Sequence, residues 1–207
     1  MRIILASKSP RRRELLSRIG IEYECMVSEM EENITESEPD KVVRELSCQK
    51  AENVFEILKA EGKTDKAPMV IIGADTVVAC DGEIMGKPKD EDDARRMLKL
   101  LRGRSHSVWT GVTMLFINID KNGNINEDKV ISEAFACETK VYMYPVPDIE
   151  IDEYIKTKEP MDKAGAYGIQ GKGALLIKGI QGDYNNVVGF PLAAFFRLGC
   201  QKKFFRL

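Results

Sequence analysis

Short apolar runs alternate with amphipathic stretches along this chain, and the first pair lies near the N-terminus. Ile3-Ile4-Leu5 has the continuous apolar character of a short buried strand. A polar loop follows, and Ser9 and Pro10 then supply a favoured N-cap residue and a favoured first helical residue. The predicted helix ends before Gly20 and buries Leu15, Leu16 and Ile19.

A longer amphipathic pattern predicts a second helix from about Asp40 to Ala60. Its apolar face consists of Val43, Leu46, Ala51, Val54, Phe55 and Leu58. Further helices are predicted over residues 90–101, over residues 148–156 and from Pro191 onward.

Four apolar stretches predict strands, at residues 69–79, 108–119, 130–143 and 174–178. Asp81-Gly82 and Asn122-Gly123 are typical hairpin turns. Strands and helices are mixed without strict alternation, and no repeat or low-complexity linker separates them. The pattern therefore predicts an α/β fold with a long, partly antiparallel sheet.

Composition changes this picture little. The chain has 207 residues, of which 43% are hydrophobic and 31% charged, enough for one large domain or two small lobes. A net charge of −2 argues against a general nucleic-acid binder. No secretory signal or membrane-spanning run is visible, so we expect a soluble, cytoplasmic protein with no membrane or nucleic-acid partner.

The five cysteines are scattered without metal-ligand spacing and are interpreted as small reduced core residues: Cys25, Cys48, Cys80, Cys137 and Cys200. The single histidine, His106, argues against a His-rich zinc site. It has no evident nucleophile partner, so a structural role is favoured over that of a base.

The segment Ser7-Lys8-Ser9-Pro10-Arg11-Arg12-Arg13 places three arginines in the first turn of the first predicted helix. There they oppose the helix dipole and repel one another. A bound polyphosphate would satisfy both the arginines and the backbone N–H groups at the Ser9 helix start. The alternative is a solvated basic patch, and the helix-start context favours phosphate binding.

Asp75 interrupts an apolar strand in Ile71-Ile72-Gly73-Ala74-Asp75-Thr76-Val77-Val78. A carboxylate in such a strand is costly unless it is paired, hydrogen-bonded or bound to a metal. Mg²⁺ prefers carboxylate oxygens and shares them with substrate phosphates. Glu31 and Glu32 could supply a second carboxylate. The alternative is a structural aspartate held by backbone N–H groups.

Two further segments offer polar groups to a ligand. Gly86-Lys87-Pro88 forms a tight turn that could present the Lys87 ammonium to a phosphate, although most such lysines are simply exposed. The glycine-rich stretch 159–173 lets backbone approach a ligand, and Gln170 offers a donor and an acceptor to a base edge. It lacks the order of a P-loop, and the alternative is a pair of turns between a helix and a strand.

These segments, in this order, resemble the Maf family of nucleotide pyrophosphatases, and the resemblance runs essentially end to end. Its markers are Leu5-Ala6-Ser7-Lys8-Ser9-Pro10-Arg11-Arg12, Gly73-Ala74-Asp75-Thr76-Val77-Val78, Gly86-Lys87-Pro88, Gly103-Arg104-Ser105-His106, the run from Asp162 to Gly171, and the run from Gly182 to Gly189.

The resemblance implies one Maf-like domain over residues 1–207. It would have an elongated, two-lobed mixed sheet with flanking helices, similar to the inosine-triphosphate pyrophosphatases, with the active cleft between the lobes. It also implies cleavage between the α- and β-phosphates of a nucleoside triphosphate. The branch with Ala-Tyr-Gly-Ile-Gln, as here, is associated with dTTP and UTP. A sister branch with Glu in place of Gln170 is associated with 7-methyl-GTP.

By position, Asp75 matches the family's proton acceptor, while Arg11, Thr76 and Gln170 match positions tied to substrate choice. Other pocket positions fall on Ser7, Arg12, Glu32, Lys50, Lys87, Asp162 and Lys163. Mg²⁺ or Mn²⁺ on Glu32 and Asp75 would bridge the phosphates. Three small departures from the family pattern, which leave the activity assignment intact, are Lys8, Arg102 and Phe190.

Two other functions stay open at this point. A nucleotide-binding regulator of cell division could use the same pocket without catalysis, although an intact Asp75, Lys87 and Glu32 argues against it. A phosphatase that removes the terminal phosphate would release orthophosphate instead of pyrophosphate. A homodimer is compatible with the resemblance alone.

Overall fold

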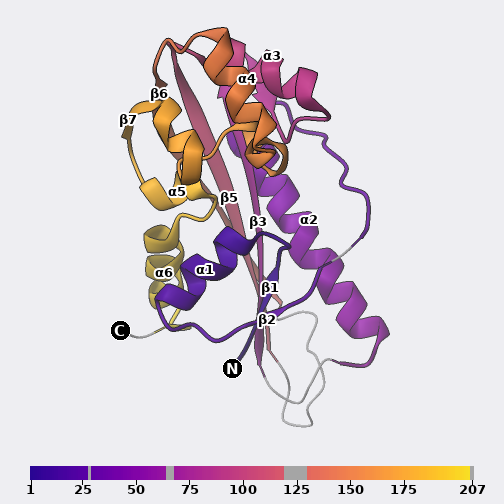
Figure 1. Ribbon diagram of the computed structural model, residues 1–207. Helices are drawn as coiled ribbons and strands as arrows, with labels where there is room; N and C mark the ends of the chain where they lie inside the picture. Colours follow the sequence, from indigo (N-terminus) through magenta and orange to yellow (C-terminus); the bar gives the residue numbers. More distant parts are fainter. Residues whose placement is uncertain (28, 64–67, 119–129, 206–207) are drawn as a thin grey trace. The chain divides into compact units, whose positions relative to one another are not determined.

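The computed structural model describes residues 1–27, 29–63, 68–118 and 130–205 (Figure 1). Its helices are α1 (Pro10–Arg18), α2 (Pro39–Ala60), α3 (Glu91–Leu101), α4 (Asp148–Lys156), α5 (Tyr184–Val188) and α6 (Leu192–Gln201). Its strands are β1 (Arg2–Ala6), β2 (Glu24–Cys25), β3 (Met69–Cys80), β4 (Glu83–Met85), β5 (Ser105–Ile117), β6 (Ile131–Met143) and β7 (Ile177–Gln181). Short 3₁₀ helices are η2 (Glu159–Asp162), η3 (Ala164–Ala166) and η4 (Gly171–Leu176).

The strands are hydrogen-bonded in the order β2-β1-β3-β5-β6-β7, with β4 paired to β3. β1 runs parallel to β3, with Ile4 opposite Ile71, and also parallel to β2. The β3–β4 and β6–β7 pairs are antiparallel. The predicted α/β class and the partly antiparallel sheet are therefore confirmed.

The chain forms two compact units. Unit 1 comprises Met1–Asp75, Gly111–Ala136 and Leu192–Leu207, and unit 2 comprises Thr76–Thr110 and Cys137–Pro191. The boundary falls inside β3, between the consecutive residues Asp75 and Thr76.

In unit 1, α2 packs directly on the sheet backbone. A Cβ atom at Gly73 of β3 would lie 2.0 Å from the Ser47 carbonyl oxygen, and one at Gly111 of β5 would lie 2.2 Å from that of Val43. Glycine at both positions lets the helix approach this closely. All six apolar residues predicted for the face of α2 are buried. This contact brings the middle of α2, including Lys50, to β3.

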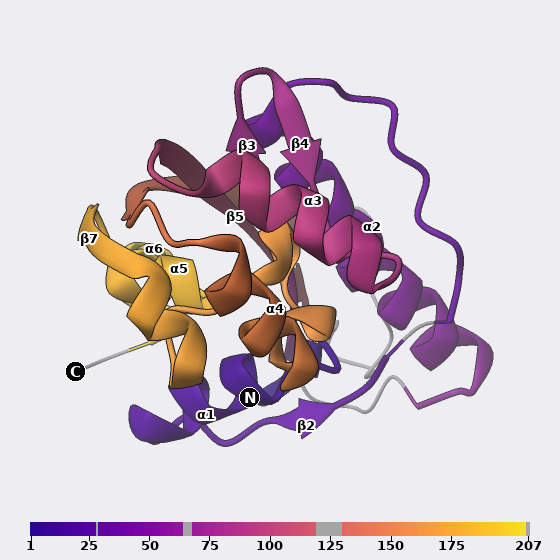
Figure 2. The ribbon, with the colours of Figure 1, turned by 45° about the horizontal axis from the view of Figure 1, so that its top comes forward.

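In unit 2, α3 and α4 lie side by side and cover a second apolar core (Figure 2). Ion pairs join the two helices, from Arg95 to Asp152 and from Lys99 to Asp148, the latter at 2.7 Å. The predicted hairpin turn at Asp81-Gly82 joins β3 to β4, with both residues at positive φ (49° and 83°). Asn122-Gly123 lies outside the described residues.

α1 begins as predicted, with Ser9 at the N-cap and Pro10 at the first position, and it buries Leu15 and Leu16. The prediction for Ile19 is wrong, because its side chain is 39% exposed. Ile19 caps the helix C-terminus, and the chain turns away at Gly20, which has a φ of 73°. The Ile19 side chain therefore lies beyond the last helical turn that faces the core.

The strand predicted at 174–178 is also wrong for most of its length. Residues 171–176 form the 3₁₀ helix η4, and β7 begins only at Ile177. The Glu159 carboxylate accepts the backbone N–H groups of Lys172 and Gly173, so η4 starts with partners that no strand supplies. β5 begins at Ser105, three residues before the predicted start, and the short elements β2 and α5 were not predicted.

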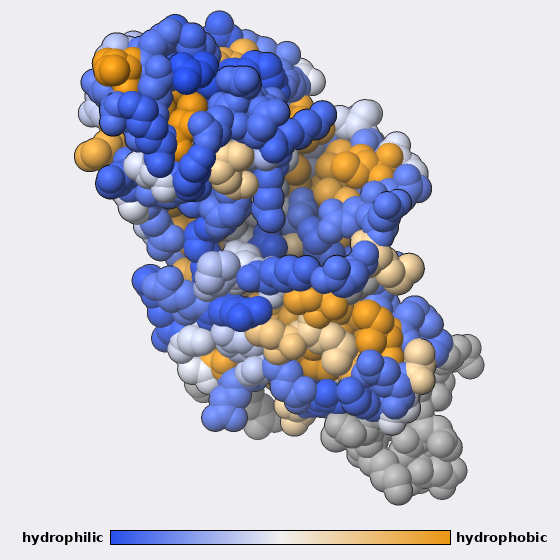
Figure 3. Space-filling view, turned by 45° about the vertical axis from the view of Figure 1, so that its right-hand side comes forward, coloured by the Kyte–Doolittle hydropathy of each residue, from blue (hydrophilic) through white to orange (hydrophobic). Residues whose placement is uncertain are grey.

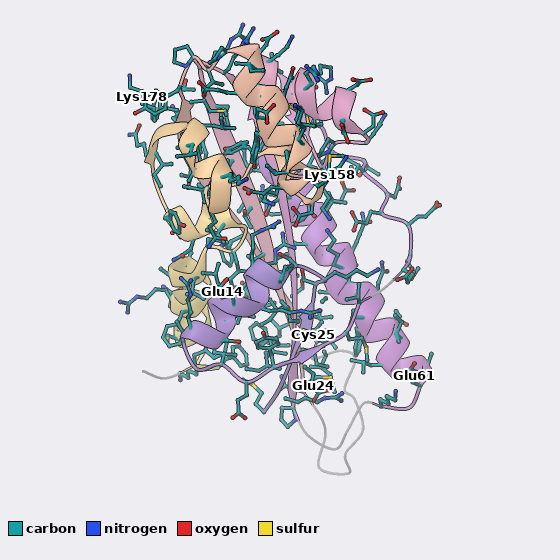
Figure 4. All side chains as sticks on the ribbon, viewed as in Figure 1. Glu14, Glu24, Cys25, Glu61, Lys158 and Lys178 are labelled. Carbon is teal, nitrogen blue, oxygen red and sulfur yellow. The ribbon has the colours of Figure 1, made fainter. Side chains whose placement is uncertain are left out.

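All five cysteines are free thiols, but only Cys80 is buried, and Cys25 is exposed, so the core assignment is wrong for most of them. Cys25 lies on β2 beside Glu24, which accepts a 2.8 Å hydrogen bond from Arg2 (both β2 residues are labelled in Figure 4).

Among the described residues, no helix has the length and apolar character to cross a bilayer. Polar side chains cover most of the face in Figure 3, interrupted by smaller apolar areas.

Candidate functional site

The residues that the sequence assigns to the site fall into one group in each unit, and the first begins at α1. The Ser7 hydroxyl oxygen accepts a hydrogen bond from the Arg12 guanidinium at 3.1 Å and another from the Ser9 backbone N–H at 3.2 Å. Ser7 is only 5% exposed, and the Ser9 side chain forms no capping hydrogen bond. Ser7 thus holds Arg12 in place at the start of the helix.

Arg12 lies in the field of several charged groups. Burial lowers the pKa of Arg12, Asp75 and Glu32 raise it, and Arg11 lowers it. Because an arginine side chain stays protonated in proteins, the result is a permanent, partly desolvated positive charge beside the Asp75 carboxylate. Such a charge attracts an anionic ligand more strongly than one in bulk water.

Lys50 of α2 joins two carboxylates. Its ammonium contacts Asp75 Oδ1 and lies 3.2 Å from Glu32 Oε1. The Asp75 side chain is 17% exposed and that of Lys50 is 23% exposed. The sequence expectation that a carboxylate in this apolar strand needs a partner is confirmed, and Lys50 is that partner.

The segment that carries Glu32 is fixed to α2 by Gln49. The Gln49 amide accepts from the Asn33 N–H at 3.0 Å and donates to the Asn33 carbonyl at 2.6 Å. Thr35 is held in the same way, because its N–H and hydroxyl donate to Glu45. Sequence reasoning missed Gln49, whose only signal was its place next to Lys50.

Glu32 and Asp75 fit the donor set expected for a divalent cation that is shared with phosphates. They are hard oxygen ligands that converge on one positive charge, and Mg²⁺ commonly takes one or two carboxylates and completes its shell with water and phosphate oxygens. No group of three or more His, Cys, Asp or Glu side chains with metal-binding geometry occurs in the described part of the chain.

In unit 2, the turn at Lys87 lies beside the glycine-rich stretch. The Gly86 carbonyl accepts a 3.0 Å hydrogen bond from the N–H of Gly165. Lys87 is exposed, and no hydrogen bond or ion pair joins it to any residue that the structure describes. Its ammonium is therefore available to a ligand.

Glu159 organises the glycine-rich stretch. Its carboxylate accepts hydrogen bonds from Lys172 N–H and Gly173 N–H, both at 3.0 Å, and from the Tyr154 hydroxyl at 3.1 Å. Partial burial opposes ionisation, but these hydrogen bonds outweigh it and lower the pKa of Glu159. Gly171 has a φ of 66°, which L side chains rarely adopt, and a Cβ atom there would also lie 2.8 Å from the carboxylate, so glycine is favoured. The stretch wraps around one ionised side chain.

Lys163 and Asp162 pair with each other. The Lys163 ammonium donates to Asp162 Oδ1 and to the Glu159 carbonyl, both at 2.6 Å. The Lys163 side chain is 13% exposed, and its methylenes lie against Gly168. Gln170 is half-buried, and its amide forms no hydrogen bond with the described residues. The lysine thus shapes the loop, whereas the glutamine amide is left for a ligand.

Thr76 and His106 are both anchored inside unit 2. The Thr76 hydroxyl lies 3.0 Å from the Thr110 hydroxyl. His106 is buried, its Nε2 atom lies 2.6 Å from the Tyr167 hydroxyl, and burial lowers its pKa to about 4. A neutral histidine in the core agrees with the predicted structural role.

The comparisons with known proteins identify the family of this chain. The family model described as Maf-like protein matches residues 2–201. The chain belongs to the Maf family. The resemblance predicted from the sequence motifs is thereby confirmed.

Curated relatives match this Maf chain over nearly its full length. A dTTP/UTP pyrophosphatase of Agathobacter rectalis is 53% identical over 201 residues, which cover 94% of each chain. One of Carboxydothermus hydrogenoformans is 48% identical and covers 95% of this chain and 96% of its own. One of Bacillus cereus is 44% identical and covers 95% and 93%.

Among solved structures, the Staphylococcus aureus Ham1 protein is similar with a TM-score of 0.42 and 14% identity, over 70% of this chain and 73% of its own. A likeness of this extent does not decide the fold of the Maf chain, which rests on the strand order given above.

Proposed function

We propose that this Maf chain hydrolyses dTTP and UTP to the nucleoside monophosphate and pyrophosphate. The observation that carries the proposal is the near full-length identity of 44–53% to relatives named dTTP/UTP pyrophosphatase. The charged cluster of unit 1, defined as Arg11, Arg12, Glu32, Lys50 and Asp75, supports it, because this cluster offers the charges that phosphoanhydride cleavage needs.

The triphosphate would bind the cationic side chains Arg11, Arg12 and Lys50 of unit 1. Lys87, which lies in unit 2, stays a pocket residue assigned by the family resemblance. Ser7 holds Arg12, and the α1 start at Ser9 adds a helix N-terminus that favours anions. Together these groups would neutralise the phosphates and the leaving pyrophosphate.

Asp75 is the proposed proton acceptor for the attacking water. Glu32 and Asp75 would also hold Mg²⁺ or Mn²⁺, which, when bound, supplies further charge neutralisation and lowers the pKa of water. Lys50 contacts both carboxylates and would hold Asp75 in its orientation. Displacement at the α-phosphorus would then release pyrophosphate.

The base would be bound by unit 2. Gln170 is neutral and offers both a donor and an acceptor, which suits the carbonyl and imide N–H of uracil or thymine. Thr76, Asp162 and Lys163 complete the proposed nucleotide-binding set. A homodimer stays a prediction of the family resemblance, and a cytoplasmic location stays a prediction from the sequence.

Product analysis tests the proposal. The purified chain is incubated with dTTP, UTP, CTP and 7-methyl-GTP in the presence of Mg²⁺ or Mn²⁺, and the products are separated. We expect monophosphate and pyrophosphate, formed fastest from dTTP and UTP. Orthophosphate with a nucleoside diphosphate would identify a terminal phosphatase. Nucleotide binding without turnover with either metal would identify a binding regulator.

A further inference from the structure

Gln170, the proposed base contact, lies on a loop of unit 2 whose two ends are in contact. Gly168 and Gly173 form the neck of this loop, because a Cβ atom at Gly173 would lie 2.4 Å from the Gly168 carbonyl oxygen. The backbone turns back at Gly171, which has a φ of 66°. Residues 169–172 therefore form the body of a closed loop, and Gln170 lies in that body.

Tyr154 of α4 lies against this neck. The Gly168 N–H donates to Tyr154 Oη at 3.2 Å, and a Cβ atom at Gly173 would lie 2.5 Å from the same oxygen. Tyr154 is only 5% exposed and belongs to the apolar core of unit 2. α4 itself is joined to α3 by two ion pairs, so the hydroxyl is presented to the neck from a fixed position.

The groups around the Tyr154 hydroxyl determine the direction of its hydrogen bonds. A backbone N–H only donates, so Tyr154 Oη accepts from Gly168. The hydroxyl hydrogen is donated to Glu159 Oε1, an ionised acceptor that lies 3.1 Å away. Glu159 in turn accepts from the N–H groups of Lys172 and Gly173 at 3.0 Å each. Tyr154 and Glu159 thus form one continuous chain of hydrogen bonds that joins the two ends of the loop.

We propose that Tyr154 is a positioning residue for base binding: together with Glu159 it locks the neck of the loop, so that the backbone of Gln170 is already in its binding position before the nucleotide arrives. This inference rests on the proposed function, in which Gln170 contacts the base. It adds a residue that lies outside every motif that carries the family resemblance.

The lock is expected to act on affinity more than on the rate of the chemical step. A loop that is ordered in advance loses less conformational entropy when a ligand binds. The order is the same in the ground state and in the transition state, so it lowers KM without raising kcat. The competing explanation is a tyrosine that serves only to fill the core with its ring, and a phenylalanine would fill the same space.

Tyr154→Phe separates these two explanations, because it keeps the ring and removes the hydroxyl. Gly168 N–H then loses its acceptor, and Glu159 loses a donor. We expect KM for UTP to rise about tenfold, the effect of one hydrogen bond, while kcat changes less than about threefold. Amide hydrogen exchange, followed by NMR without nucleotide, should become about tenfold faster at Gly168, Lys172 and Gly173.

Tyr142→Phe is the matched control. Tyr142 belongs to β6 of the same unit, and its hydroxyl donates to Gln181 at 3.2 Å instead of to a residue of the loop neck. This variant also loses a tyrosine hydroxyl that has a side-chain partner. It is expected to leave KM for UTP and the three exchange rates within about twofold of their original values. Equal changes in Tyr142→Phe and Tyr154→Phe would overturn the proposal.

A double variant shows whether Tyr154 acts through Gln170. Gln170→Ala alone should raise KM for UTP, and adding Tyr154→Phe to it should raise KM no further. An unchanged KM in Tyr154→Phe, additive increases in the double variant, or unchanged exchange at Lys172 would each contradict the inference. The proposed function fails by a different result, namely that the unchanged protein forms no monophosphate and pyrophosphate from UTP, and the exchange rates still test the lock in that case.

Discussion

In unit 1 the residues assigned to the nucleotide include a charged cluster in which one lysine contacts two carboxylates. Unit 2 contributes two neutral residues, Thr76 and Gln170, beside the charged Lys87, Asp162 and Lys163. Lys50 bridges Asp75 and Glu32 in unit 1. In unit 2, the Thr76 hydroxyl lies against that of Thr110, and Glu159 holds the segment that follows Gln170. Charge stabilises phosphates and transition states, and directional hydrogen bonds distinguish bases. Under the proposed function, the chemical step therefore falls to residues of unit 1 and base selection to Thr76 and Gln170 of unit 2.

The largest expected effect comes from removing the proposed proton acceptor of unit 1. Asp75→Asn removes the proton acceptor and one ligand of the cation, so kcat for UTP should fall about 10³-fold, within the range of general-base catalysis. The UTP:CTP ratio should stay within about threefold of its original value, since base selection is assigned to unit 2. Steady-state kinetics with both nucleotides measures this. A kcat within tenfold of the unchanged protein would remove Asp75 from the catalytic step.

A second change loosens the segment that carries Glu32 without replacing Glu32 or Asp75, the two proposed metal ligands. Gln49→Glu places a carboxylate oxygen against the Asn33 carbonyl, so the segment that carries Glu32 should loosen. The Mg²⁺ concentration that gives half-maximal rate, and the dissociation constant for Mn²⁺ measured without nucleotide, should rise about tenfold, as for other residues that orient metal ligands. Gln201→Glu makes the same chemical change at the exposed end of α6 and should alter neither value.

A third change tests the unit 2 loop. Glu159→Gln places an amide NH₂ against the backbone donors of Lys172 or Gly173, so the loop that carries Gln170 should lose its fixed shape. KM for UTP should rise about tenfold while kcat changes less than about threefold. Glu153→Gln, on the exposed face of α4, is the control and should leave KM unchanged. A selective loss of kcat would instead place Glu159 in the chemical step.

The last prediction concerns the stability of the unit 2 core and not the activity. His106 has a pKa of about 4 when folded, against about 6.5 when unfolded, so the folded state favours the neutral ring. The contribution of the neutral ring to the free energy of unfolding is complete above about pH 6.5. It is lost as the pH falls toward 4, by about 3 kcal/mol in all.

Urea unfolding of the unchanged protein and of His106→Gln measures this contribution. Between pH 7 and 4.5 the unchanged protein should lose more stability than the variant, which has no ring to protonate. If both proteins lose the same amount of stability, protonation of His106 does not contribute to the pH dependence of unfolding.

Local patterns predicted much of this structure. The apolar period of α2, the cap at Ser9 and the cost of a carboxylate in β3 identified two helices and Asp75 without further knowledge. The supporting residues could not be found in this way, because Gln49 acts on Asn33 and Thr110 acts on Thr76, and only the fold brings these pairs together. The false strand at 174–178 has the same origin, since Glu159 supplies the hydrogen bonds that start η4.

One measurement tests the division of roles most directly: kcat/KM for UTP and CTP in Gln170→Glu beside Asp75→Asn. The glutamate lacks the amide donor for a pyrimidine carbonyl and accepts from the amino group of cytosine, so Gln170→Glu should lower the UTP:CTP ratio about tenfold. Asp75→Asn should lower both rates together and leave the ratio nearly unchanged. An equal loss on both nucleotides in Gln170→Glu, or a changed ratio in Asp75→Asn, would contradict the assignment of chemistry to one unit and selection to the other.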